Sequence, residues 1–322
     1  MALRIGLLGA SRIAPKAVIA PAAGRDDVVV TAVAARDLDR AQAYAQTHGI
    51  ATAVQGYDAL IARDDVDLVY CALPPARHIA PCVAALAAGK ALLIEKPFAM
   101  TAAQARAIAD AATEAGLPAM EAYHYRFHAM FMRALAILEQ GRLGRLVRAH
   151  GLFDATIGQT PGELRWVAAE GGGGTMDLGC YILHALRTLT AEEPVLVSAQ
   201  AELWNGVDAQ MSAALTFPSG VVATTSSSMI KARRDEILIE GELGSLRLQS
   251  FVSPQRGGKL IVTTAAGEVA EEAQGPGSYD AQLAHVVAVM CGDTAPLTGG
   301  EDAVATMSII DAIRRAAGMA FD

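Results

Sequence analysis

The sequence predicts an α/β protein with two domains, and three features lead to this expectation. The chain has 322 residues, enough for two domains of ordinary size. Residues 3–122 alternate short apolar, β-branched runs with alanine-rich stretches, the pattern of a parallel sheet covered by helices. From Leu146 on, apolar and polar residues alternate along neighbouring segments, which favours an antiparallel sheet. We therefore expect a doubly wound parallel sheet in residues 1–122 and an α+β domain with a large, mostly antiparallel sheet in residues 123–322.

Local signals place the elements within these domains. Strands of the first domain are expected at residues 3–8, 28–34, 66–72, 91–94 and 118–122. A helix over residues 39–49 ends at a glycine, and Thr101 with Gln104 forms a capping box before a long alanine-rich helix. In the second domain we expect a helix near residues 129–140 and two closing helices, 279–290 and 301–317. The last helix is a candidate to pack back on the first domain.

Composition points to a small-molecule partner. A formal net charge of −8 provides no basic surface for nucleic acid or an anionic membrane. No apolar run reaches the ~20 residues of a membrane span, and the first residues do not resemble a signal peptide. The cysteines lack metal-binding spacing and are expected to be buried, reduced and apolar in role: Cys71, Cys82, Cys180 and Cys291. We expect a cytoplasmic protein.

The stretch "GLLGASRIAP" follows the first predicted strand and has the form of a loop that binds a dinucleotide. With Gly9 at the first glycine position of G-x-G-x-x-G, Ser11 and Ala14 occupy the second and third. A small residue at each position still lets backbone N–H groups approach a pyrophosphate. Gly9, Ser11, Arg12 and Ile13 are therefore candidate cofactor residues in a Rossmann-type domain. A simple tight turn is the alternative.

The end of the second predicted strand bears on the choice of cofactor. An acidic residue there would bind the ribose 2′-hydroxyl of NAD, but this position is Ala35, followed by Arg36. An arginine suits the 2′-phosphate of NADP, and one charge-assisted hydrogen bond of ~1.5–3 kcal/mol favours NADP about ten- to a hundredfold. In the alternative, Arg36 is a solvated surface residue and Asp37 binds the ribose, which would suit NAD.

The stretch "LIEKPFAMT" places Glu95 and Lys96 at the carboxyl end of a predicted parallel strand. Open α/β sheets bind their ligands at this edge. Pro97 restricts Lys96 to an extended conformation, which directs its side chain out of the sheet. Lys96 could then contact both nicotinamide and substrate. A surface lysine at the end of a strand is the alternative.

The stretch "EGGGGTMDLGCYILHALRTL" supplies a second group of candidates. The glycine run is expected to let backbone approach a ligand closely, and a helix follows it with Leu178, Ile182, Ala185 and Leu189 as its apolar stripe. On that helix Asp177, Tyr181 and His184 share one face. Such a trio usually marks a solvated face, but the neighbouring glycine run favours an active-site face. His184 would bind a substrate hydroxyl or, in the alternative, serve a structural role.

Several further residues are weaker candidates. Pro74 and His78 follow a predicted strand and are expected at the edge of the cofactor site, where Glu95 also lies. Tyr123 and Trp166 are candidate substrate residues, and Trp166 and Tyr279 could stack on a sugar, although both suit a core equally well. His124 and His128 have helical metal-ligand spacing without a third ligand. We expect no metal, and a cleft or interface role for these two histidines.

These stretches resemble the glucose-fructose oxidoreductase, inositol dehydrogenase and MocA family of NAD(P)-dependent oxidoreductases along essentially the whole chain. The similarity is carried by the glycine loop, "AARDLDRAQAYA", "EKPFAMT", "EAYHYRFHAMFMRALAILEQGRLG", the glycine-run helix and "GEDAVATMSIIDAIRRAAG". The resemblance implies that Lys96 is catalytic, Asp177 orients the substrate and position 181 is the acid/base. Much of the family has histidine there. With Tyr181 at this position, the chain resembles the branch that contains glucose-fructose oxidoreductase, dimeric dihydrodiol dehydrogenase and NADP-dependent xylose dehydrogenases.

We therefore expect an NADP-dependent oxidoreductase, with NAD as a second cofactor, acting on a monosaccharide, cyclic polyol or vicinal diol. The resemblance also implies pairing of the second-domain sheet in a homodimer or larger homo-oligomer. Alternatives are a nucleotide-sensing regulator, which would not need both Lys96 and Tyr181, and an NAD-dependent glycosidase. A closed-cycle glucose-fructose oxidoreductase is a further alternative, but without an arm before the first strand we expect a dehydrogenase that releases its cofactor.

Overall fold

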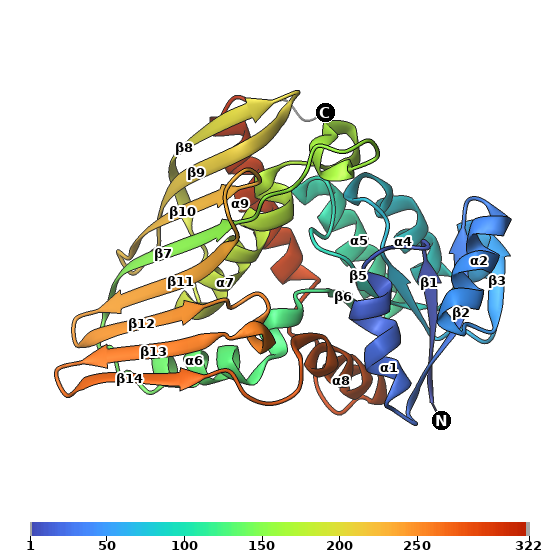
Figure 1. The fold of residues 1–322 in the computed structure, drawn as a ribbon, viewed down its shortest axis with the longest axis horizontal. Coiled ribbons are helices and arrows are strands. Elements are labelled where there is room, and N and C mark those ends of the chain that lie inside the picture. The colour runs from blue at the N-terminus through green and yellow to red at the C-terminus, as the bar shows by residue number, and fades with distance from the viewer. Residues whose placement is uncertain (1, 320–322) are drawn as a thin grey trace. The chain divides into compact units, whose positions relative to one another are not determined.

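Two separate sheets organise residues 2–319, the part of the chain that the computed structural model describes (Figure 1). The first sheet belongs to a unit that runs to Tyr123 and also includes Tyr279–Val304. The second belongs to a unit made of His124–Ser278 and the residues from Ala305 on. The expected boundary assigned residues 279–304 to the second domain, and the structure groups them with the first.

The first unit contains a six-stranded parallel sheet in the order β3-β2-β1-β4-β5-β6, which confirms the predicted doubly wound fold. Its strands are β1 (Leu3–Leu8), β2 (Val28–Ala35), β3 (Thr52–Gln55), β4 (Leu68–Cys71), β5 (Ala91–Ile94) and β6 (Ala119–Glu121). The strand order reverses between β1 and β4, where open sheets of this type bind ligands beyond the carboxyl ends of their strands. The helices that accompany these strands are α1 (Ala20–Ala23), α2 (Leu38–His48), α3 (Tyr57–Ile61), α4 (Ile79–Ala87) and α5 (Ala102–Ala115).

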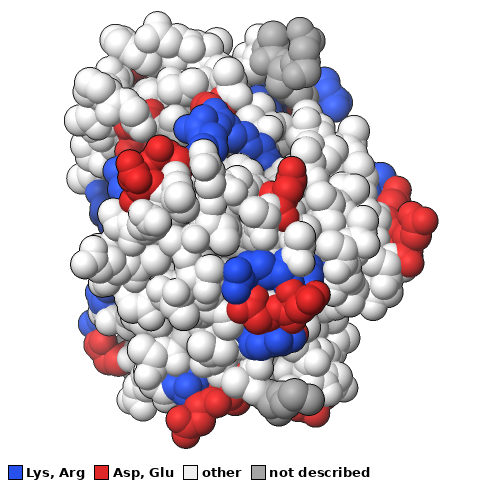
Figure 2. All heavy atoms as spheres, turned by 90° about the vertical axis from the view of Figure 1, so that its right-hand side faces the viewer, with Lys and Arg blue, Asp and Glu red and all other residues white. Residues whose placement is uncertain are grey.

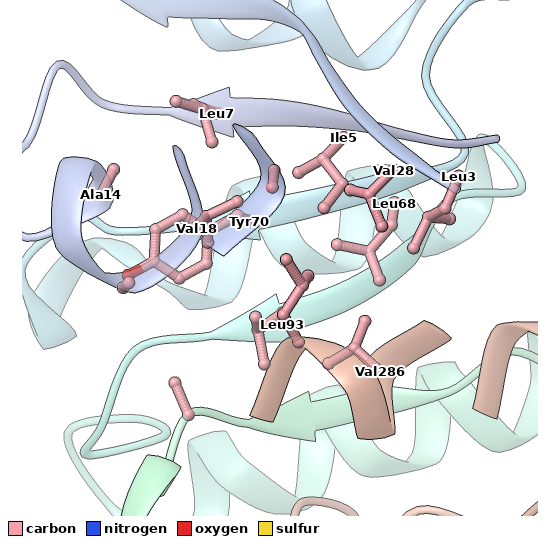
Figure 3. Close-up of a cluster of buried hydrophobic side chains, with 14 of the residues drawn as sticks. Leu3, Ile5, Leu7, Ala14, Val18, Val28, Leu68, Tyr70, Leu93 and Val286 are labelled. Carbon is pink, nitrogen blue, oxygen red and sulfur yellow. The ribbon is translucent and has the colours of Figure 1, made fainter. Parts of the chain in front are cut away.

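Helix α8 (Ser278–Cys291) explains why a late segment joins the first unit. Its Leu283 and Val286, each 1% exposed, belong to the apolar core built on β1, β2, β4 and β5. Figure 3 shows Val286 among side chains of these strands, including Leu93 and Leu68. Burying apolar side chains is worth ~1.5–3 kcal/mol each, which holds this helix to the first sheet despite its distance in sequence.

The second unit contains an eight-stranded sheet in the order β14-β13-β12-β11-β7-β10-β9-β8. Its strands are β7 (Leu146–Asp154), β8 (Val195–Trp204), β9 (Val207–Thr216), β10 (Val222–Ser228), β11 (Arg234–Gly241), β12 (Gly244–Gln249), β13 (Lys259–Thr264) and β14 (Gly267–Glu272). All neighbouring pairs are antiparallel except β7 with β10, as expected for a mostly antiparallel sheet.

Helices of the second unit pack on one face of this sheet. They are α6 (Ala129–Glu139) and α7 (Cys180–Thr190). Helix α9 (Glu301–Ala316) begins in the first unit, and its Thr306 hydroxyl accepts a hydrogen bond from Arg187 of α7. Gly151 on β7 lets α7 approach closely, because a Cβ atom there would lie 2.0 Å from Cγ2 of Ile182. On the opposite face, β9 and β10 carry mostly small polar side chains, with Val222 as a large exposed apolar residue. This face of the two strands is therefore largely polar.

The start of the α7 segment depends on a buried carboxylate, Asp208 on β9. Its Oδ2 accepts hydrogen bonds of 2.6 Å from both the backbone N–H and the hydroxyl of Thr175, the first residue of the π-helical turn Thr175–Gly179 (η6). The adjacent Gly173 has φ +124°, and a Cβ atom there would lie 2.2 Å from Oδ1 of Asp208. Gly172 approaches the backbone of Arg165 in the same way. Gly172 and Gly173 thus leave room for the protein's own groups, and an approach of this run to a ligand stays a prediction.

We expect Gly173→Ala to lower the free energy of unfolding by about 2–4 kcal/mol, because it adds both a positive-φ penalty and an overlap with a buried carboxylate. Denaturant unfolding measures the loss. Gly206→Ala is the matched control, since Gly206 has φ +83° but its Cβ atom would meet only Ala168 Cβ at 3.7 Å. Equal losses in the two variants would show that Asp208 does not constrain this turn.

Candidate functional site

In the glycine loop after β1, only the first of the three glycine positions has a backbone conformation that requires glycine. Gly9 has φ +101°, and a Cβ atom there would lie 3.1 Å from Cδ2 of Leu73. Ser11 replaces the second glycine and uses its hydroxyl oxygen to accept a 3.2 Å hydrogen bond from the N–H of Ala14. Ala14 is fully buried in the core beneath the loop. Arg12 is exposed and Ile13 is half-buried.

Two residues of α2 that we did not select from the sequence hold this loop. Arg40 donates a 3.0 Å hydrogen bond to the carbonyl of Ala10, and the Tyr44 hydroxyl donates one of 2.9 Å to the carbonyl of Ser11. Both contacts join residues about 30 positions apart. Their only signal in the sequence is that they lie one turn apart on a predicted helix. They fix the two carbonyls, so the loop is held in one conformation.

Arg36 and Asp37 follow β2, and the structure gives them different tasks. Oδ1 of Asp37 accepts a 2.9 Å hydrogen bond from the N–H of Arg40 and caps α2. Arg36 is exposed, and its guanidinium makes no hydrogen bond or ion pair with another residue in the described part of the chain. In the alternative that favoured NAD, the Asp37 carboxylate would bind the ribose, but in the structure it accepts the capping hydrogen bond. Arg36 is left available to an anionic group.

Glu95 and Lys96 lie at the carboxyl end of β5, as the sequence predicted. Both are partly buried, and the peptide bond between Lys96 and Pro97 is cis. The Tyr70 hydroxyl on β4 donates a hydrogen bond to Oε1 of Glu95. Burial raises the pKa of the Glu95 carboxyl, while this bond and the charge of Lys96 oppose the shift. The two residues place a positive and a negative side chain at the ligand-binding edge of the sheet.

Pro74 and His78 lie in the turn between β4 and α4. Pro74 is half-buried, whereas His78 is completely buried. The Nε2 atom of His78 lies 2.8 Å from the carbonyl of Leu73, and Nδ1 lies 3.1 Å from the carbonyl of Phe98. Both ring nitrogens of His78 therefore contact protein carbonyls, and its place at the edge of the cofactor site stays a prediction.

Asp177 lies within η6 of the second unit, with its side chain 20% exposed. Oδ2 of Asp177 is 3.6 Å from Nη1 of Arg165, whose guanidinium also forms a two-pronged ion pair with Glu163 at 2.8 and 2.9 Å. Arg165 and Glu163 were not selected from the sequence, because nothing in their spacing links them to Asp177. Arg165 holds the Asp177 carboxylate at one side and leaves part of it exposed.

Tyr181 lies one turn beyond Asp177, at the start of α7, within a group of aromatic side chains. Its ring is 5.7 Å from Phe153, 5.9 Å from Tyr125 and 6.0 Å from His124. The guanidinium of Arg233 lies 5.2 Å above the ring of Phe153. At 6% exposed, Tyr181 retains a small accessible surface. The face shared by Asp177 and Tyr181 is therefore mostly enclosed by protein, not solvated.

His184 is fixed in the interior next to this group. It is 1% exposed, and Nδ1 lies 2.5 Å from the hydroxyl of Tyr125. The same hydroxyl also lies 3.5 Å from the carbonyl of Tyr181. This burial supports the structural alternative for His184 rather than contact with a substrate hydroxyl.

The remaining candidates have structural contacts. Tyr123 is fully buried, the indole N–H of Trp166 donates a 3.1 Å hydrogen bond to Ile157, and Tyr279 packs in the core of the first unit beneath the ammonium of Lys16. His124 bonds Ser278 at 2.8 Å, whereas His128 caps α6 by accepting a hydrogen bond from Met130. Within residues 2–319, no group of three or more His, Cys, Asp or Glu is placed to hold a metal. Cys291 is exposed, in contrast to the expectation that all four cysteines are buried.

The distribution of charge on the described surface and the hydropathy of the described helices do not point to a further functional site. On the face shown in Figure 2, basic and acidic side chains lie together in small groups. None of the helices described has the length and apolarity needed to cross a membrane.

Comparisons with known proteins place this geometry in a family. Residues 3–123 match the model described as "Oxidoreductase family, NAD-binding Rossmann fold", and residues 131–247 match the "GFO/IDH/MocA C-terminal domain". The chain is 33% identical over 319 residues to D-xylose 1-dehydrogenase (NADP(+)) 2 of Haloferax volcanii, covering 98% of this chain and 97% of the relative. It is 32% identical to trans-1,2-dihydrobenzene-1,2-diol dehydrogenase of Mus musculus, covering 79% and 77%.

Solved structures agree. The crystal structure of aldose-aldose oxidoreductase from Caulobacter crescentus, complexed with glycerol, superimposes with a TM-score of 0.91 at 28% identity and covers 99% of this chain and 98% of the other. Two matched family models, full-length relatives and a shared fold confirm the resemblance stated from the motifs. The chain belongs to the GFO/IDH/MocA family of NAD(P)-dependent oxidoreductases.

Proposed function

We propose that this protein is an NADP-dependent dehydrogenase that transfers hydride between nicotinamide and a monosaccharide, cyclic polyol or vicinal diol. The observation that carries the proposal is the face of η6 and α7, where Asp177 and Tyr181 lie one turn apart among aromatic side chains. Two relatives support the substrate class by their names, one for a sugar and one for a 1,2-diol.

The first unit fits the cofactor. The loop from Gly9 to Ser11 is fixed by Arg40 and Tyr44 and lies at the carboxyl end of β1, the edge at which open α/β sheets bind their ligands. Arg36 is exposed at the end of β2 and supplies the cation that a 2′-phosphate requires. The named cofactor of the xylose dehydrogenase relative supports NADP.

Tyr181 acts as the acid/base and Lys96 as the cation that makes this possible. The pKa of free tyrosine is ~10, and lowering it by about 3 units requires about 4 kcal/mol. A lysine ammonium at ~4 Å supplies roughly that amount at an effective dielectric constant near 20. The proposal assigns this role to Lys96.

Asp177 and Arg165 orient the substrate before proton transfer. The partly exposed carboxylate of Asp177 can accept a hydrogen bond from a substrate hydroxyl, while Arg165 fixes its direction from the other side. Tyr181 would take the proton of that hydroxyl, and NADP, when bound, would supply the hydride acceptor. In the reverse direction Tyr181 returns the proton.

A second candidate, aldose–aldose oxidoreduction with retained cofactor, is favoured by the similarity to the Caulobacter crescentus enzyme. The primary experiment separates the two. Purified protein is mixed with NADP or NAD and a panel of aldoses, inositols and trans-diols, and absorbance of the reduced nicotinamide is followed. The proposal predicts net reduction with one class and preference for NADP. Turnover of paired aldoses without net absorbance change, with nicotinamide retained through purification, would support the second candidate.

We expect Tyr181→Phe to lower turnover at least about 100-fold, because a positioned acid/base contributes about 10²–10⁴-fold. NADP affinity, measured by fluorescence titration, should stay unchanged. The matched control is Tyr125→Phe, which removes a neighbouring hydroxyl that contacts His184. This control should lose about 1–3 kcal/mol of stability while retaining most turnover. Normal turnover in Tyr181→Phe would refute its assigned role.

We expect Arg36→Ala to weaken NADP binding about ten- to a hundredfold and to leave NAD binding unchanged, because only NADP carries the 2′-phosphate. Titration of each cofactor measures the selectivity. Asp37→Ser is the control, since serine preserves the helix cap without the carboxylate. Selective loss of NAD binding in Asp37→Ser, with Arg36→Ala unaffected, would favour the reading in which Asp37 binds the ribose.

We also propose that the open sheet face pairs with a second copy of the chain. Val195 and Val222 flank Thr216 on this face and are 63% and 52% exposed. Sedimentation equilibrium should give a dimer or larger assembly that Val222→Lys weakens. A wild-type monomer at micromolar concentration would contradict the proposal.

A further inference from the structure

A buried histidine connects the two segments that border the carboxyl ends of β4 and β5. His78 has no exposed surface, and its ring lies between the carbonyl of Leu73 after β4 and the carbonyl of Phe98 after Lys96 and Pro97. The distances of 2.8 and 3.1 Å are those of hydrogen bonds. The ring therefore links the turn before α4 to the segment that carries Lys96.

The two partners determine the hydrogens on this ring. A backbone carbonyl only accepts hydrogen bonds, and a neutral imidazole has one N–H donor and one acceptor nitrogen. A neutral ring could therefore satisfy one contact and would place a nitrogen lone pair against the other carbonyl oxygen. Both contacts become hydrogen bonds only when both nitrogens carry hydrogen, and the ring is then a cation.

A counter-charge for such a cation lies nearby. The Glu95 carboxylate interacts electrostatically with both His78 and Lys96, and it accepts the hydroxyl of Tyr70. On β4, Cys71 also faces His78; its hydrogen bond with the Cys82 thiol is the main cause that lowers its pKa to about 7. A buried charge is stable where hydrogen bonds and an opposite charge compensate its lost hydration.

We propose that His78 is a buried imidazolium that ties the Leu73 turn to the Lys96–Phe98 segment and balances the charge of Glu95. Where the Cys71 thiol keeps its proton, Glu95 and Lys96 alone make a neutral group, whereas with His78 the group holds one net positive charge. That charge is what an acid/base tyrosine needs. His78 is thus a positioning residue that acts through Lys96. Its effect on catalysis rests on the proposed function, but its protonation does not.

The first test reads the ring directly and needs no substrate. In protein labelled with ¹⁵N-histidine, both His78 ring nitrogens should show the chemical shift of protonated nitrogens at about pH 7.5, where a free histidine is mostly neutral. The signal is assigned by its loss in His78→Gln. If that variant does not fold, neutron diffraction from the wild type locates the ring hydrogens instead. One protonated nitrogen and one lone-pair nitrogen would overturn the proposal.

The second test separates the charge from the contacts. In His78→Gln, an amide replaces the cation, and the tyrosine limb of the kcat pH profile should move up by about one pH unit or more. Adding Glu95→Gln removes the unbalanced carboxylate and should return the limb toward its wild-type position. A purely structural role would lower kcat or stability without moving the limb, and an unmoved limb would overturn the charge role. If no substrate is found although the ring is doubly protonated, the proposed function fails while the imidazolium stands.

Discussion

The buried carboxylate of Asp208 is the constraint on which the second unit's site depends. Burial raises its pKa, which shows that the interior disfavours its charge, while two hydrogen bonds from Thr175 oppose this effect. One of those bonds satisfies the backbone N–H of Thr175, a donor that helix geometry leaves without a partner at the start of η6, and the other binds the Thr175 hydroxyl. Asp177 and Tyr181 follow Thr175 within six residues. The carboxylate on β9 therefore helps to position the backbone from which both side chains extend. The glycine run makes this close approach possible, because a side chain at Gly173 would overlap the Asp208 carboxylate.

Much of the fold could be predicted because its signals are local. β1 and β5 were expected at their observed bounds, and α2 ends at Gly49 in the left-handed conformation that glycine favours. β3 escaped prediction because Thr52–Gln55 has four residues and none is fully buried, so it carries no apolar pattern. The grouping of α8 with the first sheet could not be inferred either. Its apolar face would suit any core, and only the packing partners decide which one it joins.

The candidate site divides in the same way. Motifs placed Lys96 at the carboxyl end of a strand and Asp177 with Tyr181 on one helical face, because strand ends and helix periodicity can be read from a single segment. Arg165, Arg40 and Tyr44 were missed because their contacts join separate segments. His78 was expected at the edge of the cofactor site, and His184 either at a substrate hydroxyl or in a structural role; both are buried against protein groups. The sequence shows which polar residue lies near a motif and what chemistry its side chain allows. The groups that this side chain contacts depend on the tertiary structure.

In the proposed mechanism, tyrosine rather than histidine at position 181 makes the acid/base dependent on nearby charges. Histidine titrates near neutrality unaided, so a histidine acid/base makes a small demand on its environment. Tyrosine titrates about 3 units above neutrality and depends on a cation to lower its pKa. Glu95 would reduce the effect of Lys96 if it were the nearest counter-charge. A cationic His78 near Glu95 removes that conflict, because the carboxylate then balances the charge of a ring that itself bonds the carbonyl of Phe98 after β5. A tyrosine-dependent site on this scaffold therefore needs its second cation more than a histidine-dependent one does.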